Sequence, residues 1–360
     1  MAVHRASSNP MGTVALVLLS VAVAGGGLEV ALRLLAIDVA SYHSIAGFAV
    51  YDPDLGWKLA PARETLFKGT HFSVRVAHNS EGLRDRHYAY DRELGRRRIL
   101  VLGDSVVWCW GVEQTDCFTE RLERALGDTD VINAGVPGYS TAQELLFYER
   151  EGRRYQSDLV VLVMSPNDPD DNIDRRGPRF QLDGGQLTHL KVAPPRRKSL
   201  LHEWLQGHSR LFASVSYLAA VAAQSLRSAD RSPAALAHVG DGRSAMVAAP
   251  TPTSTPSTWA LTEALLDRLD AAVQMDGARL VVVLEEMSVS MGSWQRGFWA
   301  ARGVPCLELE PALAAAEKRG EQVRLEDDPH LSALGQAVAA DELGLFLERQ
   351  GVLGPPGSTP

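Results

Sequence analysis

The chain has 360 residues, of which 45% are hydrophobic and 22% are charged, and its formal net charge is −8. This composition excludes a wholly disordered chain, which has few apolar residues and a high net charge, and a protein with many membrane spans. The acidic balance argues against nucleic acid as the main partner, because such a partner needs a concentrated Lys and Arg surface. We therefore expect one mostly soluble globular body with an additional segment.

The additional segment is at the N-terminus, where no charged residue occurs between Met11 and Leu28. Such a run is at the lower limit of a membrane span. It predicts residues 1–37 as a retained signal anchor, with Arg5 on the cytoplasmic side and the rest of the chain exported. The alternatives are a signal peptide cleaved after the small-residue pattern Ala22-Val23-Ala24 and a buried core helix. A lipoprotein is excluded because no cysteine follows the run.

Beyond the anchor the sequence predicts three further parts. Residues 38–97 form an irregular lead-in region with short strands such as Phe72–Val76, residues 98–350 form an α/β domain, and residues 351–360 form a disordered tail. Five apolar runs at α/β spacing predict the strands of that domain. These runs are Arg98–Leu102, Val131–Asn133, Leu159–Met164, Leu280–Leu284 and Cys306–Leu309. Because the strands are apolar throughout and helical stretches separate them, we expect a five-stranded parallel sheet in a three-layer α/β/α arrangement.

The predicted helices of the domain are Cys117–Leu126, Thr141–Arg150, Thr258–Met275, Pro311–Arg319 and Leu331–Arg349. Residues 170–256 are an insertion between the third and fourth strands. The insertion opens with charged residues, including Asp170, Asp171 and Asp174, which we interpret as a solvated loop rather than a metal site. A helix over 200–226 should pack against the domain, with a second membrane contact as the alternative. The Ser-, Ala-, Pro- and Thr-rich stretch 228–257 should form a flexible loop.

Polar residues follow the first three strands and recur near the C-terminus. Gly103-Asp104-Ser105, Asn133-Ala134-Gly135 and Ser165-Pro166-Asn167-Asp168 come at strand ends, and Asp327-Asp328-Pro329-His330 stands further along the chain. In open α/β sheets, ligands bind at the carboxyl ends of the strands. A serine on a tight turn, a histidine to take its proton and an aspartate to orient that histidine are the components of nucleophilic acyl transfer. The N–H groups of Ser105 and Gly135 and the amide of Asn167 would stabilise the oxyanion.

These four blocks, in this order, resemble the SGNH hydrolase (GDSL-type lipase/esterase) family over about residues 98–350. The resemblance implies a flavodoxin-like SGNH hydrolase fold with Ser105 as nucleophile, His330 as base and Asp327 as its orienting acid. It also implies that Ser105, Gly135 and Asn167 form the oxyanion hole. The lead-in blocks Tyr51–Trp57 and Asn79–Asp85 are similar to those of bacterial members with an N-terminal membrane helix. Many of those members are thought to act on acylated polysaccharides.

Three questions stay open about residues in or near these motifs. Ser165 and Cys109 stand where many family members have glycine, which adds bulk near the expected pocket. Asp328 is adjacent to Asp327 and is an alternative orienting acid, although the D-x-x-H spacing favours Asp327. Cys109 and Cys117 are interpreted as buried free thiols, with a disulfide between them as the alternative in an exported protein.

The sequence therefore predicts a membrane-anchored, exported serine esterase of SGNH type that acts on acyl esters, including O-acetyl groups of an envelope or secreted polysaccharide. An O-acyltransferase using the same triad is an alternative, and so is a non-catalytic, membrane-anchored assembly factor for polysaccharide production. No cofactor and no metal are implied, because neither a phosphate-binding glycine loop nor a metal-ligand set is present. The expected partners are an acylated small molecule or glycan and the membrane, and the sequence leaves protein partners unknown.

Overall fold

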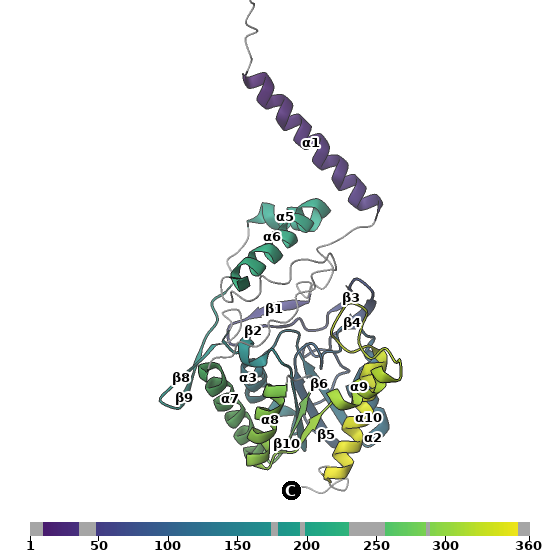
Figure 1. Ribbon diagram of the computed structural model, residues 1–360, viewed down its shortest axis with the longest axis vertical. Coiled ribbons are helices and arrows are strands. Elements are labelled where there is room, and N and C mark those ends of the chain that lie inside the picture. Colours follow the sequence, from purple (N-terminus) through teal and green to yellow (C-terminus); the bar gives the residue numbers. More distant parts are fainter. Residues whose placement is uncertain are drawn as a thin grey trace, which may run out of the picture. The chain divides into compact units, whose positions relative to one another are not determined.

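The structure, a computed structural model, describes residues 10–35, 48–173, 179–194, 199–229, 256–285 and 289–351. Contacts divide the chain into two compact units, one formed by residues 1–44 with 196–244 and the other by residues 45–195 with 245–360 (Figure 1). Several expectations fall outside the described residues: Arg5, Asp174, the middle of the loop predicted over 228–257 and most of the tail 351–360.

The second unit is built on a five-stranded sheet whose strand order is β11-β10-β7-β5-β6, and all of its pairings are parallel. The strands are β5 (Arg97–Gly103), β6 (Thr129–Gly135), β7 (Leu159–Met164), β10 (Arg279–Leu284) and β11 (Cys306–Glu308). The prediction of five strands and a parallel sheet is confirmed. The chain order reverses between β5 and β7, and such a switch point opens a crevice at the carboxyl ends of the strands.

Helices cover both faces of the sheet (Figure 1), so the three-layer α/β/α prediction is also confirmed. Alternate residues of β5 enter two separate cores: Leu100 and Leu102 join one, and Ile99 and Val101 join the other. This double burial explains the continuous apolar strands. The helices of this unit are α2 (Phe118–Leu126), α3 (Thr141–Arg150), α4 (Asp168–Asp171), α7 (Pro256–Met275), α8 (Val289–Arg302), α9 (Glu310–Lys318) and α10 (Ala333–Gln350). The sequence analysis did not predict α8.

The lead-in region shares the core of the sheet domain. It forms two antiparallel hairpins, β1 (Ala49–Asp52) with β2 (Gly56–Leu59) and β3 (Glu64–Lys68) with β4 (Ser73–Ala77). Their buried residues Phe48, Phe67 and Val76 belong to the same apolar cluster as Leu100 of β5. A third hairpin, β8 (Arg179–Asp183) with β9 (Gln186–Leu190), lies within the insertion. The lead-in strands therefore fold together with the sheet domain.

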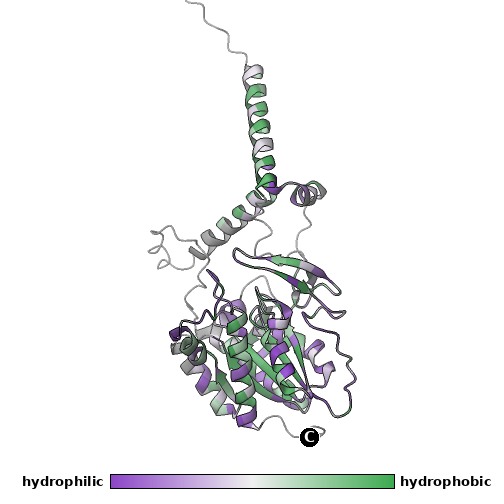
Figure 2. Ribbon diagram, turned by 90° about the vertical axis from the view of Figure 1, so that its right-hand side faces the viewer, coloured by the Kyte–Doolittle hydropathy of each residue, from purple (hydrophilic) through white to green (hydrophobic). Residues whose placement is uncertain are grey.

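The first unit contains α1 (Pro10–Leu34), α5 (Leu200–His208) and α6 (Arg210–Ala229). The single helix predicted over 200–226 is two helices separated by Ser209, which corrects that prediction, and both belong to the same compact unit as α1. Within Met11–Leu34 of α1, a window of 18 residues has a mean hydropathy of 2.1 and none of that window is buried. Figure 2 shows this apolar character along the helix. An exposed N-terminal apolar helix is consistent with a signal sequence or an anchor.

Candidate active site

Ser105 lies on a tight turn directly after β5. The turn is held by its own backbone, because the Val106 N–H donates to Oδ1 of Asp104 (3.0 Å) and the Trp108 N–H donates to the Asp104 carbonyl (3.0 Å). The Trp110 N–H donates to the Ser105 carbonyl (3.1 Å). A Cβ on Gly103 would meet Cγ2 of Val107 at 2.3 Å, so this turn requires glycine at the strand end. The strand and turn together present the Ser105 hydroxyl at the carboxyl edge of the sheet.

His330 reaches Ser105 from the segment before α10. A β-bridge between Arg324 and Leu331 closes this segment, the Leu325 N–H donates to the His330 carbonyl (2.9 Å), and Nη1 of Arg324 donates to the Pro329 carbonyl (2.7 Å). Nε2 of His330 lies 2.8 Å from Oγ of Ser105. Residues 225 positions apart in the chain are thus in hydrogen-bond contact.

Asp328, and not Asp327, contacts His330. Oδ1 of Asp328 lies 2.5 Å from Nδ1 of His330 and also accepts the His330 backbone N–H at 3.0 Å. This is an Asx-turn, in which a short carboxylate bonds the backbone two residues further on. Asp327 has φ of +55° and a side chain that is 67% exposed, and its Oδ2 lies 3.3 Å from Nε2 of His71. The D-x-x-H spacing is present, but the structure does not bring Asp327 to His330.

Trp110 supports the His330–Asp328 pair, and the sequence analysis did not single it out. Its ring stacks on His330, with 5.0 Å between centroids and 16° between planes, and its Nε1 donates to Oδ2 of Asp328 at 3.3 Å. Phe67 packs edge-on against the other side of this aromatic group, 4.6 Å from Trp110. Trp110 thus restrains both the imidazole ring and the carboxylate. A chain of Asp, His and Ser held in this way can activate a serine for nucleophilic attack.

The two predicted oxyanion residues, Gly135 and Asn167, have different surroundings. The Gly135 N–H donates to Oδ1 of Asn133 at 3.0 Å, and a Cβ there would meet the Trp108 backbone N at 2.3 Å. Gly135 therefore permits close packing between β6 and the Ser105 turn, and its N–H is not directed to Ser105. Asn167 lies at the carboxyl end of β7 and is partly exposed, and Nδ2 of its side chain donates to Asp171 at 2.6 Å.

The turn that follows β6 offers a different glycine. Val136-Pro137-Gly138-Tyr139 closes with a hydrogen bond from the Tyr139 N–H to the Val136 carbonyl (3.0 Å), and Gly138 has φ of +76°, which is typical of a type II turn. The Val136 N–H donates to the Gly103 carbonyl (3.1 Å), so this turn begins beside the Ser105 turn. Gly138 is exposed, and the structure gives its N–H no acceptor among the described residues.

Arg84, from the lead-in block Asn79–Asp85, holds the far end of the Ser105 turn. Its side chain is buried, and its guanidinium donates to the carbonyls of Trp108 (2.8 Å), Cys109 (2.6 Å) and Val112 (2.6 Å). The guanidinium carbon also lies 4.9 Å from the centroid of the Trp108 ring. The lead-in block therefore contributes directly to the support of the site.

We expect Arg84→Met to destabilise the fold by about 3–5 kcal/mol, because buried carbonyls lose the cation that satisfies them. Arg86→Met is the matched control. Its side chain is 48% exposed, and its buried partner Asp130 keeps Arg96 and Arg98 when Arg86 is replaced, so we expect a loss of about 1 kcal/mol or less. Chemical unfolding monitored by tryptophan fluorescence measures both. Equal losses in the two variants would contradict a special role for Arg84.

Three buried carboxyl groups lie behind the site: Asp104 after β5, Glu144 in α3 and Asp168 after β7. Burial raises the pKa of Glu144 well above its usual range, and the negative charge of Asp104 raises it further. Burial likewise raises the pKa of Asp168, to which Glu144 and Asp104 add. Neither oxygen of the Glu144 carboxyl has a hydrogen-bond partner among the described residues. The folded protein therefore favours a neutral Glu144.

This arrangement makes stability fall as pH rises. Glu144 is neutral in both states below its unfolded pKa, and above that value the unfolded chain releases the proton while the folded chain retains it. Glu144→Gln removes the contribution of Glu144 to this dependence, so the stability of the variant relative to the wild type should rise steadily between pH 5 and pH 8. Thermal unfolding across that pH range tests this. Glu149→Gln, in the same helix but paired with Arg268, should show no such growing gain.

The sequence left open the roles of Cys109, Cys117 and Ser165, and each has a simple structural role. Cys109 has φ of +60°, the conformation that favours glycine, and its buried Sγ lies 3.6 Å from Oε1 of Gln336 in α10. Its side chain therefore enters the core. Cys109 and Cys117 are both buried free thiols, and burial raises the pKa of Cys109. Ser165 is buried, and its N–H donates to Oδ2 of Asp168 (3.0 Å).

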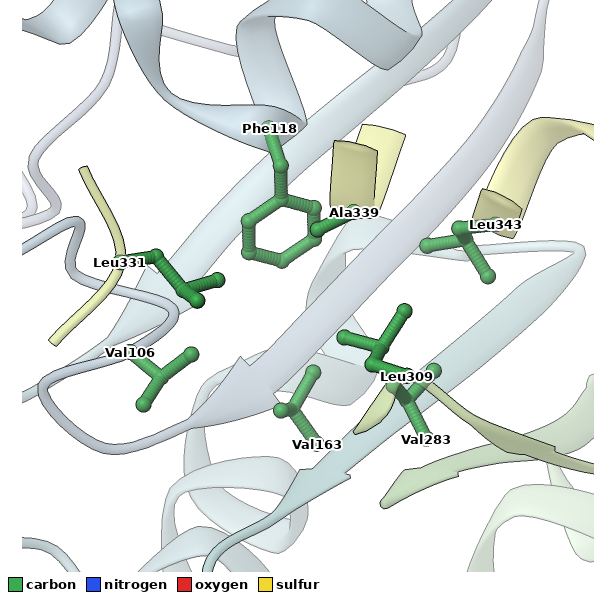
Figure 3. Close-up of a pocket in the computed structure, with 8 residues that line it drawn as sticks. All are labelled: Val106, Phe118, Val163, Val283, Leu309, Leu331, Ala339 and Leu343. Carbon is green, nitrogen blue, oxygen red and sulfur yellow. The ribbon is translucent and has the colours of Figure 1, made fainter. Parts of the chain in front are cut away.

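A small apolar cavity of about 10 Å³ lies beneath the site (Figure 3). Its walls include Val106, which follows Ser105, and Leu331, which follows His330, together with Phe118, Val163, Val283, Leu309, Ala339 and Leu343. The lining is apolar and the volume is at most that of one water molecule, so the cavity is a packing defect of the core. Among the described residues, no group of three His, Cys, Asp or Glu could hold a metal ion.

No protein-family model and no curated protein matches the chain. Solved structures do match, and two of them are described as lipolytic proteins of the G-D-S-L family. A member from Veillonella parvula has 12% identity and a TM-score of 0.40, covering 70% of this chain and 99% of that chain. The psychrotrophic esterase EstA from Pseudoalteromonas sp. has 12% identity and a TM-score of 0.41, covering 71% and 98%. A two-domain esterase active on acetylated mannans has 12% identity and a TM-score of 0.39, covering 74% and 52%. The chemistry therefore rests on the geometry of this chain's own residues.

Proposed function

We propose that the protein is a serine ester hydrolase in which Ser105 is the nucleophile, His330 the general base and Asp328 the acid that orients His330. The observation that carries this proposal is the continuous contact of the three side chains. Ser105 Oγ lies 2.8 Å from Nε2 of His330, whose Nδ1 lies 2.5 Å from Asp328. Each distance is within reach of proton transfer without rearrangement of the chain.

In the proposed reaction, Oγ of Ser105 attacks the ester carbonyl while Nε2 of His330 takes its proton. The tetrahedral intermediate collapses to an acyl-serine, and His330 gives the proton to the departing alcohol. A water molecule, deprotonated by His330, then attacks the acyl-serine. When this second tetrahedral intermediate collapses, His330 returns the proton to Oγ of Ser105 and the acid is released. Asp328 stabilises the imidazolium that forms twice in this cycle, and Trp110 keeps the ring in the required plane.

We propose that three donors stabilise the oxyanion: the N–H groups of Ser105 and Gly138 and the side-chain amide of Asn167. Gly138 takes the role first predicted for Gly135, because the N–H of Gly135 is bound to Asn133. Donors from the ends of β5, β6 and β7 would then surround one point near Ser105. This is how preorganised oxyanion holes draw on separate loops.

Asn167→Ala should lower kcat on a p-nitrophenyl ester by on the order of 10²–10³-fold with a small change in KM, because the donor acts on charge that develops in the transition state. Asp171→Ala is the control, since it removes the partner of the amide but leaves the amide present. We expect a smaller loss for Asp171→Ala. If the two variants lose the same activity, Asn167 acts only through loop structure.

The substrate class that we propose is an O-acetyl ester of an envelope or secreted polysaccharide, processed by an enzyme attached to the membrane through α1. This rests on the resemblance of the lead-in blocks to those of anchored bacterial SGNH members. Release of acetate from acetylated glycans, compared with release of longer acids from p-nitrophenyl esters, tests the acyl group. Inclusion of a sugar acceptor tests transfer, because an O-acyltransferase would form an acetylated acceptor in place of free acetate.

The primary experiment is labelling with a fluorophosphonate probe followed by peptide mass spectrometry. The proposal expects one modified residue, Ser105, in the wild type and no modification in Ser105→Ala. His330→Ala should label far more slowly, because the serine loses its base. A wild-type protein that does not label would favour a non-catalytic assembly factor.

A further inference from the structure

The end of α1 is joined to the start of α6 through Glu29. The carboxylate of Glu29 accepts hydrogen bonds from Oγ of Ser209 (2.9 Å) and from the backbone N–H groups of Arg210 (3.1 Å) and Leu211 (2.9 Å). The first N–H groups of a helix have no acceptor within that helix. A residue about 180 positions earlier in the chain therefore caps α6.

Two further hydrogen bonds join α1 to α5 and α6 close to Glu29. Nη1 of Arg210 donates to the Leu32 carbonyl (3.0 Å), and Nη2 of Arg33 donates to the carbonyl of His208 at the end of α5 (2.5 Å). Glu29 is the first charged residue after the apolar run Met11–Leu28. If that run spans the bilayer, these contacts fix the junction of α5 and α6 at the exported surface of the membrane.

The exposed positions of α5 and α6 include large apolar residues, beside the polar Gln206 and His208 of α5. Leu201, Trp204, Val215 and Leu218 are large hydrophobic residues that are each more than half exposed. On α6 the exposed positions Val215, Leu218, Ala219 and Ala222 follow the spacing i, i+3, i+4, i+7, which is a single stripe along a helix. The preceding residues Ala213 and Ser214 are buried. We call Leu201, Trp204, Val215, Leu218, Ala219 and Ala222 the α5–α6 apolar face.

We propose that the α5–α6 apolar face lies in the headgroup boundary of the bilayer, beside the point where α1 leaves the membrane. Three observations favour lipid as the occupant. The face is joined to α1, whose own apolar surface is exposed along its length. It carries a tryptophan, the residue type enriched at membrane interfaces. The residues that fix the junction, Glu29, Arg33 and Arg210, are charged, as expected at the polar level of the bilayer.

The consequence is a two-point membrane attachment, consisting of one spanning helix and one interfacial helix pair capped by it. This inference depends on α1 being an anchor and does not depend on the esterase activity. An inactive protein could still have the attachment, and an active one could lack it.

The test uses the full chain, verified by intact mass, in nanodiscs of phosphatidylethanolamine and phosphatidylglycerol. Single cysteines at Leu201→Cys, Val215→Cys and Leu218→Cys carry the fluorophore NBD in a Cys306→Ala background, because Cys109 and Cys117 are buried. Leu94→Cys is the matched control, since Leu94 is a fully exposed leucine in the other unit. Variants are accepted only when they melt at the wild-type temperature.

We expect probes on the α5–α6 apolar face to show blue-shifted emission and a severalfold loss of intensity when the lipids are brominated close to the headgroup. The probe at position 94 should be unaffected. Solvent-like emission without quenching at positions 215 and 218 would overturn the proposal. Blue-shifted emission that brominated lipids do not quench would also overturn it, because protein, either a second copy or another part of the chain, would then cover the face.

Discussion

Ser105→Ala should reduce hydrolysis of a short p-nitrophenyl ester by a factor on the order of 10⁵, to the level of the uncatalysed reaction plus any contribution from the oxyanion donors. The reason is that no other hydroxyl replaces Ser105 at Nε2 of His330, so the covalent step is lost entirely. The loss should appear in kcat, with little change in substrate binding. Steady-state kinetics on the purified wild type and variant measure it.

The fold should survive this change. Within the described part of the chain, the Ser105 side chain makes one hydrogen bond, to His330, while the turn around it is held by backbone groups, by the Asp104 side chain and by Arg84. The melting temperature of Ser105→Ala should therefore stay within about 2 °C of the wild type, which corresponds to a change of about 1 kcal/mol or less. Turnover that persists at the wild-type rate in a folded Ser105→Ala protein would refute the proposed mechanism.

The sheet was predictable because its strands carry an unambiguous signal. Each is a short apolar run that ends in glycine or a polar residue, and burial on both faces leaves no other reading of such a run. The same signal placed Ser105 at a strand end. Helix α8 gave no comparable signal, because it contains two glycines and two serines within Val289–Arg302 and lacks a clear apolar stripe. The hairpins β1–β2 and β8–β9 were not predicted, although Phe180 and Leu182 alternate with polar residues in β8, which is a strand signal.

Site residues could be predicted from the sequence where their place at a strand end decides which contacts they make. They could not be predicted where the local backbone geometry decides those contacts. Gly135 is the glycine nearest the strand end, but a residue still paired within the sheet cannot direct its N–H into a crevice. The Pro137-Gly138 pair is a recognisable turn signal and could have identified the exposed donor. Trp110 could not have been found in this way, because its contact with His330 joins segments more than 200 residues apart.

Asp328 and Asp327 differ by one position, and their separate replacement by asparagine is the sharpest test of the site. Asp328→Asn should lower kcat by on the order of 10⁴-fold, because an amide at Nδ1 of His330 no longer stabilises the imidazolium and favours the wrong tautomer. Asp327→Asn should leave activity within about twofold. Asparagine tolerates the left-handed conformation of that position, and the exposed contact with His71 contributes at most about 1 kcal/mol to stability.

The Asp327→Asn and Asp328→Asn variants also show which aspartate of the Asp327-Asp328-Pro329-His330 motif acts with His330. A loss confined to Asp327→Asn would mean that the D-x-x-H spacing, and not the Asx-turn, describes the active protein, and that the loop rearranges before catalysis. A loss confined to Asp328→Asn would mean that Asp328-Pro329-His330 is the functional unit. In that unit one carboxylate oxygen both closes the turn and holds the imidazole, so the backbone and the base are positioned by the same atom.

Trp110→Phe should then retain the ring stacking but lose the bond to Asp328, and its activity should fall between that of the wild type and that of Asp328→Asn.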